Sequence, residues 1–273
     1  MIKICITVRN RLAITKKCIE SLERFTCSEK SIHIYDNLTN YRFDEHLEYY
    51  MQLYTEGIID KFVINSEQST YNCFSKAVCF NEFGFNHIQD PGRDKTNFLV
   101  LLDNDMLVCP AWDIYVRAIM EYISDKKQFD DIRIITQNPG GVTDRKQSFK
   151  VFDMGFEIGV HGGSGFWCLR PNFFDDIGFL DLNLVKGINK KHDQNYWDKI
   201  AKKTKGRPYS LAINKKLALH TGPLLSGSVC DILTKHNNDQ QQIKFEELDK
   251  QIENISFEDF YKQIKDEPRC LNW

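Results

Sequence analysis

The first 105 residues alternate short apolar runs with amphipathic stretches, and no other feature of the sequence restricts the fold as strongly. The apolar runs are rich in β-branched residues and predict buried strands at Ile2–Val8, 32–35, 62–64 and 98–102. The stretches between them carry apolar residues at three- and four-residue intervals, which predicts helices at Leu12–Phe25, 43–59 and 73–85. Strands that alternate with helices are joined by right-handed crossovers. We therefore expect an α/β fold with a mainly parallel central sheet and helices on both faces.

Beyond residue 105 the pattern is less regular. Helices are expected at 112–123, Phe173–Ile177 and 195–203, and strands at 132–136, 151–158, 165–169 and 211–219. The polar segment that opens at Asn138 and reaches about Lys150 is expected to be a loop. We interpret residues 1–225 as one domain, with a nucleotide-binding half at 1–105 and an acceptor-binding half at 106–225.

The last part of the chain, from Asn237, is rich in Asn, Gln, Glu and Lys. Phe245, Leu248, Ile252 and Ile255 recur there at helical spacing and predict an amphipathic helix. Residues 226–273 are therefore interpreted as a C-terminal helical extension. Its apolar face would dock on the body of the protein or on a second copy, and the second case would make a homo-oligomer.

Composition excludes several classes of protein. The 36 basic and 38 acidic residues give a net charge of −2, which argues against binding to nucleic acid or membrane through global charge. The nine cysteines are odd in number, form no CxxC pair and mostly lie in apolar runs, which favours reduced, buried thiols. The first residues enter a strand-like run without a secretory leader, and no apolar run approaches the ~18–20 residues of a transmembrane helix. We expect a cytoplasmic protein.

Polar side chains follow three of the four N-terminal strands. The first strand runs into Thr7, Val8, Arg9 and Asn10, the second ends at Asp36, and the fourth ends at Asp103. Ligands of open parallel sheets bind outside the carboxyl ends of the strands, so these groups are expected at one binding edge. Asp36 could accept a hydrogen bond from a nucleobase or a ribose hydroxyl, although Asp after a strand is more commonly a turn former.

The strongest local signal is the carboxylate pair Asp103 and Asp105 around Asn104. If the backbone stays extended, residues i and i+2 point to the same side, where two carboxylates repel each other unless a cation lies between them. Mg²⁺ or Mn²⁺ would serve, with water and phosphate completing its shell. The alternative is a turn or helix cap ahead of Pro110. The absence of a basic residue beside the pair in sequence favours the metal.

These motifs, taken in order, resemble a known family. The segments at 4–22, 101–105, 162–181 and 192–197 resemble the opening strand and Asn-Arg turn, the Asp-x-Asp element, the glycine-led strand and the Glu-Asp helix start of family-2-like glycosyltransferases with the GT-A fold. The resemblance covers residues 2 to about 220. It departs from the family where His192 replaces the usual Glu, where 65–77 lacks a glycine, and where 86–97 looks like an insertion.

The resemblance implies a function and a set of site residues. It implies a metal-dependent, inverting transfer of a sugar from a UDP-sugar to an acceptor hydroxyl, with Mn²⁺ or Mg²⁺ bound by Asp103 and Asp105. His220, which ends the strand-like run 211–219, is expected to complete the shell of the ion. For His220, a contact to the diphosphate or a purely structural role are alternatives. The nucleotide contacts that it implies are Thr7, Val8, Arg9, Asn10, Asp36, Asn72, Lys76, Asp103 and Asn104.

Asp193 is the base that the resemblance implies. It precedes an expected helix, whose dipole favours the ionised carboxylate, and such a group can take the proton of an attacking hydroxyl. Without the resemblance, Asp193 would be interpreted as a helix cap.

Two other functions compete with this hypothesis. A sugar nucleotidylyltransferase would need a glycine-rich loop after the first strand, and residues 7–15 contain no glycine. A catalytically inactive relative that only binds nucleotide sugars or serves as a scaffold is disfavoured by the joint presence of Asp103, Asp105 and Asp193. The acceptor is left open among a glycan, a lipid-linked glycan, a protein side chain and a modified nucleic-acid base.

Overall fold

A computed structural model describes residues 1–37, 39–65, 72–137, 147–151, 154–160, 165–185, 192–221 and 238–267, and for 72–75, 151, 184–185, 192–193 and 238 it describes the backbone alone. The centre of the molecule is a nine-stranded sheet in the order β3-β2-β1-β4-β9-β6-β10-β8-β7. Its strands are β1 (Ile2–Val8), β2 (Lys30–Asn37), β3 (Lys61–Asn65), β4 (Phe98–Asp103), β6 (Ile134–Gln137), β7 (Gln147–Val151), β8 (Met154–Gly159), β9 (Phe166–Leu169) and β10 (Ser210–Ile213).

The sheet is mainly parallel, as predicted. β3, β2, β1 and β4 pair in parallel, and β9 then runs antiparallel to both β4 and β6. β10 is parallel to β6, and the β7–β8 hairpin extends the sheet beyond it. β8 and β9 are therefore antiparallel to the other seven strands of this sheet. A separate two-stranded sheet pairs β5 (Met106–Val108) with β11 (Ala218–His220).

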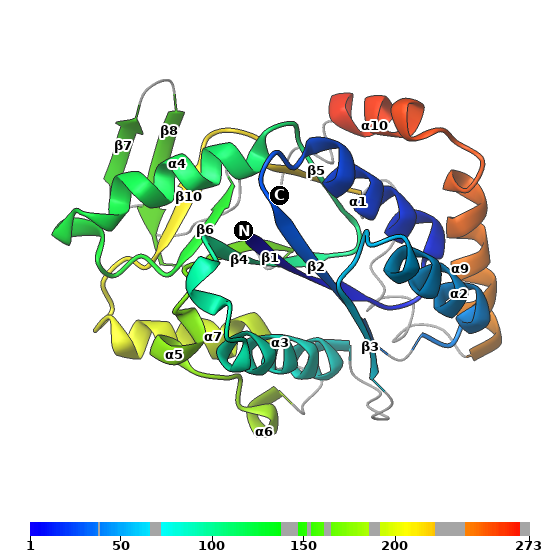
Figure 1. Cartoon of the computed structure of the whole chain (residues 1–273), viewed down its shortest axis with the longest axis horizontal. Helices are drawn as coiled ribbons and strands as arrows, with labels where there is room; N and C mark the ends of the chain where they lie inside the picture. The colour runs from blue at the N-terminus through cyan, green and yellow to red at the C-terminus, as the bar shows by residue number, and fades with distance from the viewer. Residues whose placement is uncertain are drawn as a thin grey trace.

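Helices cover both faces of the sheet, as Figure 1 shows. One face carries α1 (Leu12–Phe25), α2 (Phe43–Thr55) and α4 (Trp112–Ser124), and the other carries α3 (Asn72–Gln89), α5 (Phe173–Ile177), α6 (Leu182–Val185) and α7 (His192–Lys203). An apolar core lies on each face of the sheet, one under α1, α2 and α4 and the other under α3, α5 and α7. Side chains alternate along β1, so Ile4 packs into the core under α1 and Cys5 into the core under α3. Burial on both faces is why the strands that lie at the centre read as continuous apolar runs.

The predicted elements of the first 105 residues are confirmed, with shifted ends. Later in the chain two expectations are wrong. Residues 147–150, expected in a loop, form most of β7, because Phe149 stacks on Phe156 of β8. The expected strand at 211–219 is two strands in two different sheets, β10 and β11. The inserted-looking segment at 86–97 continues α3 to Gln89 and then forms the short helix η1 (Arg93–Lys95).

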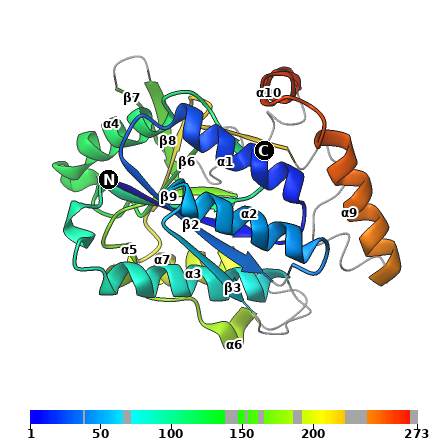
Figure 2. The ribbon, with the colours of Figure 1, turned by 45° about the vertical axis from the view of Figure 1, so that its right-hand side comes forward.

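The C-terminal extension forms two helices, α9 (Asn238–Ile252) and α10 (Phe257–Asp266), and they dock on the same chain. Figures 1 and 2 both show α9 alongside α1. Phe245 of α9 stacks on Tyr41, and Phe257 of α10 lies 5.9 Å from Phe25 of α1 between ring centroids. Of the two docking modes predicted from sequence, the structure shows docking on the body.

The cysteine expectation holds in the described part of the chain, where six cysteines are free and only Cys27 is exposed. Within the described ranges, no helix has both the length and the apolar character that crossing a membrane requires.

Gly84 allows α3 and α5 to approach closely, and this generates a stability prediction. A Cβ at position 84 would lie 2.5 Å from the buried ring of Phe174. Gly84→Ala would add about 1 kcal/mol of helix propensity, but overpacking costs typically about 1–3 kcal/mol. We expect a net loss of stability, measured by urea unfolding. In a Phe174→Ala background the same change should be neutral or stabilising, and a loss of equal size there would contradict the packing explanation.

Candidate active site

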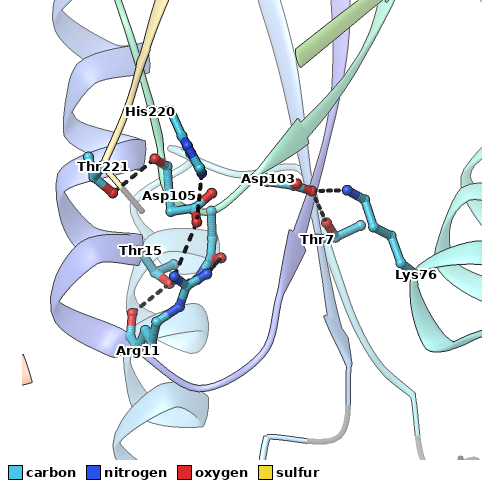
Figure 3. A network of polar contacts seen from close by, with 9 residues as sticks. Thr7, Arg11, Thr15, Lys76, Asp103, Asp105, His220 and Thr221 are labelled. Atoms are coloured by element: carbon cyan, nitrogen blue, oxygen red, sulfur yellow. Dashed lines mark hydrogen bonds and ion pairs between the residues drawn. The ribbon is translucent and has the colours of Figure 1, made fainter. Parts of the chain in front are cut away.

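The polar residues predicted from the strand ends meet at the carboxyl edge of β1 and β4. These two strands are paired in register, with Thr7 opposite Asp103. The antiparallel pair of β5 and β11 places Met106 opposite His220, which brings His220 next to Asp105. Figure 3 shows the resulting cluster, to which α1 and α3 also contribute side chains.

Asp103 faces Thr7 and α3. Its Oδ1 accepts a hydrogen bond of 3.1 Å from Thr7 Oγ1 and forms an ion pair with Lys76 Nζ. The Asp103 side chain is 27% exposed, against 9% for Lys76. Burial raises the pKa of Asp103 above its usual value, and the Lys76 ammonium opposes this rise while the Asp105 carboxylate adds to it. Asp103 is thus the most solvent-accessible carboxylate of the cluster.

Asp105 faces Arg11 and His220. Its Oδ2 lies 3.1 Å from an Arg11 Nη atom and 3.2 Å from His220 Nε2. Its backbone oxygen accepts bonds of 2.9 Å from both the amide and the hydroxyl of Thr221. Burial raises the pKa of Asp105, but the neighbouring His220 imidazole and Arg11 guanidinium outweigh burial and hold this pKa well below its usual range. The carboxylate is therefore ionised and fixed in orientation.

The two carboxylates do not share one partner, which corrects the sequence-based expectation. The chain turns at Asn104 and Asp105 between β4 and β5, so the extended backbone that would align the side chains is absent. Figure 3 shows Asp103 turned toward Lys76 and Asp105 toward Arg11. The pair also has basic partners after all, because the fold supplies Lys76 and Arg11 from segments distant in sequence.

Arg11 reaches the site from a left-handed turn. Asn10 and Arg11 have φ values of 53° and 56°, a left-handed conformation that residues other than glycine seldom adopt. The Asn10 carboxamide secures the turn, because its Oδ1 accepts bonds of 3.0 Å from the amides of Asn40 and Tyr41. Arg11 then spans Asp105 and Asn104, and its second Nη atom lies 2.9 Å from Asn104 Oδ1.

Asp36 is fully buried and organises the loop that holds Asn10. It accepts bonds of 2.8 Å from the amide and hydroxyl of Thr39 and from the hydroxyl of Tyr50, while Thr39 Oγ1 accepts the Asn10 amide at 2.9 Å. The Tyr50 hydroxyl donates its hydrogen bond to Asp36 and can only accept from His46. His46 Nδ1, 2.9 Å from the Tyr50 oxygen, must therefore carry a proton and donate it. A nucleobase contact for Asp36 stays a prediction.

The structure brings together six of the residues named from sequence: Thr7, Lys76, Asp103, Asn104, Asp105 and His220. The side chain of Val8 lies in the apolar core, so a nucleotide could contact only its backbone. The side chains of Asn72 and Asp193 lie outside the described residues, although the backbone places Asp193 in the first turn of α7, at the predicted helix start. Arg11 and Thr221 were not singled out, although the Asn-Arg turn was part of the resembling motif.

The donor set fits a divalent cation at Asp105 and His220. Their facing atoms are 3.2 Å apart, close to the ~3 Å between neighbouring ligands of an octahedral ion with bonds of ~2.1 Å. A carboxylate has about four acceptor sites, so Asp105 can keep Arg11 while it binds a cation. Asp103 is not grouped with them, and within the described ranges no three His, Cys, Asp or Glu side chains are arranged to hold a metal ion.

Comparisons with known proteins identify the fold. No protein-family model and no curated protein sequence matches the chain. Among solved structures, S. aureus TarS matches with a TM-score of 0.52 and 11% identity over 98% of this chain and 46% of TarS, so this chain spans about half of that protein. GalNAc-T7 with UDP, GalNAc and Mn²⁺ matches with a TM-score of 0.52 and 13% identity over 97% of this chain and 57% of GalNAc-T7. The Pyrobaculum calidifontis mannosyltransferase PcManGT with GDP-Man and Mn²⁺ matches with a TM-score of 0.51 and 7% identity over 91% of this chain and 68% of PcManGT.

These likenesses show that the chain has the GT-A fold of glycosyltransferases. The fold expected from the sequence resemblance is therefore confirmed.

The buried path from His46 to Asp36 predicts how stability depends on pH. Burial lowers the pKa of His46 to about 4. The unfolded chain then binds more protons than the folded one between pH 6.5 and 4, so stability falls as the pH drops through that window. We expect His46 to account for a loss of about 2 kcal/mol between pH 7 and pH 5. His46→Gln, whose amide can still donate to Tyr50, should remove that part of the loss in urea unfolding, and an unchanged pH dependence would contradict the assignment.

Proposed function

We propose that this chain is a glycosyltransferase that moves a sugar from a UDP-sugar to an acceptor hydroxyl. The observation that carries the proposal is the cluster of Arg11, Asp105 and His220, which lies at the carboxyl edge of a parallel sheet in a GT-A fold. TarS 1-349, which matches this chain with a TM-score of 0.51, has been solved with UDP-GlcNAc, and GalNAc-T7 has been solved with UDP and Mn²⁺. Both ligands contain UDP, which supports a UDP-sugar for this chain, whereas PcManGT has been solved with GDP-Man.

Asp105 and His220 would hold the divalent cation, Mn²⁺ or Mg²⁺. When bound, the cation stabilises the negative charge that develops on the leaving diphosphate. Arg11 keeps the Asp105 carboxylate ionised and in a fixed orientation, which preserves the negative charge that a divalent cation requires. The Asp103 side chain is turned toward Lys76 and away from Asp105, so it would join the cation shell only in a different side-chain orientation.

Asp103, Thr7 and Lys76 form the nucleotide side of the proposed site. Oδ1 of Asp103 is engaged by Thr7 and Lys76, which leaves Oδ2 able to accept a hydroxyl of the donor. The Lys76 ammonium lies at the same edge and provides positive charge for phosphate oxygens. Asn104 lies beneath the site and donates a bond of 2.9 Å to Thr15 Oγ1, which fixes the turn that separates the two carboxylates.

Asp193 would be the base that accepts the acceptor's proton. The amino end of α7, a helix of 12 residues, favours an ionised carboxylate in the first turn. A base on the face opposite the leaving group gives in-line displacement, so the proposed transfer inverts the anomeric carbon.

Nucleotide binding is expected to depend on a divalent cation, because the diphosphate would otherwise approach the ionised Asp105. Calorimetry should show UDP binding in Mn²⁺ that weakens about tenfold or more, equivalent to at least 1.4 kcal/mol, after chelation or in Asp105→Asn. UDP should bind more tightly than GDP. Asp175→Asn, an exposed change whose partner is Arg93, serves as the control and should bind as the wild type does. Equal affinity with Mn²⁺ and with chelator would exclude the metal role.

Asp193→Asn tests the base directly. The amide keeps the size and the capping ability of Asp but cannot take a proton. Turnover should fall by roughly 10²–10⁴-fold, while UDP affinity and thermal stability stay near those of the wild type, and the wild-type product should have inverted configuration. Asp181→Asn and His192→Gln are the matched controls, since they are the nearest alternatives for this role. Near-normal turnover in Asp193→Asn would remove the assignment.

A further inference from the structure

Helix α1 begins without a cap from its own sequence. Its N-cap residue is Arg11, which makes no side-chain capping bond, and its first turn contains no acidic residue. The first amides of a helix have no partner within the helix, so a buried first turn needs acceptors from elsewhere. Leu12 and Ala13 are both buried.

The acceptor comes from the C-terminal extension. Asp249 of α9, 236 positions later in the chain, accepts a bond of 3.2 Å from the Ala13 amide through Oδ1. Asp249 is only 1% exposed, and its Oδ2 lies 3.5 Å from an Nη atom of Arg42. Burying a carboxylate is costly, and here the amino end of α1 and the Arg42 guanidinium offset the cost only in part, because Oδ2 accepts no hydrogen bond from the described residues and burial raises the pKa of Asp249 to about 6.

The turn that Asp249 caps is the turn that enters the candidate active site. Arg11 lies one residue before the first turn and spans Asp105 and Asn104. Thr15, within the same turn, accepts a bond of 2.9 Å from Asn104 and donates one of 3.0 Å to the Arg11 carbonyl. The start of α1 is therefore attached to the site on one side and to α9 on the other.

We propose that Asp249 is a positioning residue of the nucleotide-sugar site. It caps α1 from the C-terminal extension and so holds Arg11 against Asp105, which makes α9 a functional part of the site. Asp249 itself touches no reacting atom. The part of this inference that concerns nucleotide affinity rests on the proposed function, and the part that concerns Arg11 does not.

The test compares three variants of the full chain. Asp249→Ala removes the cap, while Asp249→Asn keeps an oxygen that can accept from Ala13. Glu253→Ala is the matched control, because Glu253 lies four residues after Asp249, directly beyond the end of α9, and also binds Arg42, at 3.1 Å, without capping α1. Hydrogen exchange of the amides at 13–15 and the NMR signals of the Arg11 guanidinium measure the positioning. Calorimetry of UDP with Mn²⁺ measures its consequence.

Asp249→Ala should speed exchange of the Ala13 amide and weaken UDP binding by about fivefold to tenfold, the effect expected for loss of one helix cap. Asp249→Asn should restore most of both, and Glu253→Ala should change neither. If Asp249→Ala leaves Arg11 and the first-turn amides as in Glu253→Ala, the inference is wrong. If wild-type chain binds no UDP but the Arg11 signals respond to Asp249→Ala, the proposed function fails and the positioning role stands.

Discussion

The left-handed turn at Asn10 and Arg11 is the constraint on which the candidate active site depends. Each left-handed residue other than glycine costs roughly 1–2 kcal/mol, although asparagine pays less because its short side chain can bond locally. The turn persists because Asn10 bonds to residues 40 and 41, because Thr39 and Asp36 secure that loop, and because Asp249 caps the helix that follows. The outcome is a guanidinium placed against Asp105.

The charges of the site are arranged in two pairs and not as one carboxylate cluster. Lys76 offsets Asp103, and Arg11 offsets Asp105, so the repulsion between the carboxylates is compensated within the folded chain. This arrangement gives each carboxylate its own environment. Asp103 is partly exposed and accessible, whereas Asp105 is held ionised beside His220. A site with one accessible and one fixed carboxylate suits a ligand that carries both hydroxyls and a diphosphate.

The sequence contains enough to predict the sheet and its binding edge, because both rest on local patterns. The runs at 2–8 and 98–102 read as buried strands, and parallel strands must end at the same edge, so Thr7 and Asp103 could be placed together in advance. The ion pairs could not be predicted, since Lys76 and Arg11 reach the carboxylates only through the packing of α3 and the turn before α1. The capping of α1 by Asp249 could not be predicted either, because an amphipathic pattern predicts that α9 is a helix but not which of its side chains caps another helix.

A crystal structure with UDP and Mn²⁺ tests the account most directly, because it locates the ligand with respect to the turn. The account predicts the diphosphate and the ion at the carboxyl edge of β1 and β4, with the ion bound by Asp105 and His220 and with Arg11 still on Asp105. Nucleotide density at another surface, or an ion held away from Asp105 and His220 while Arg11 leaves the carboxylate, would contradict it.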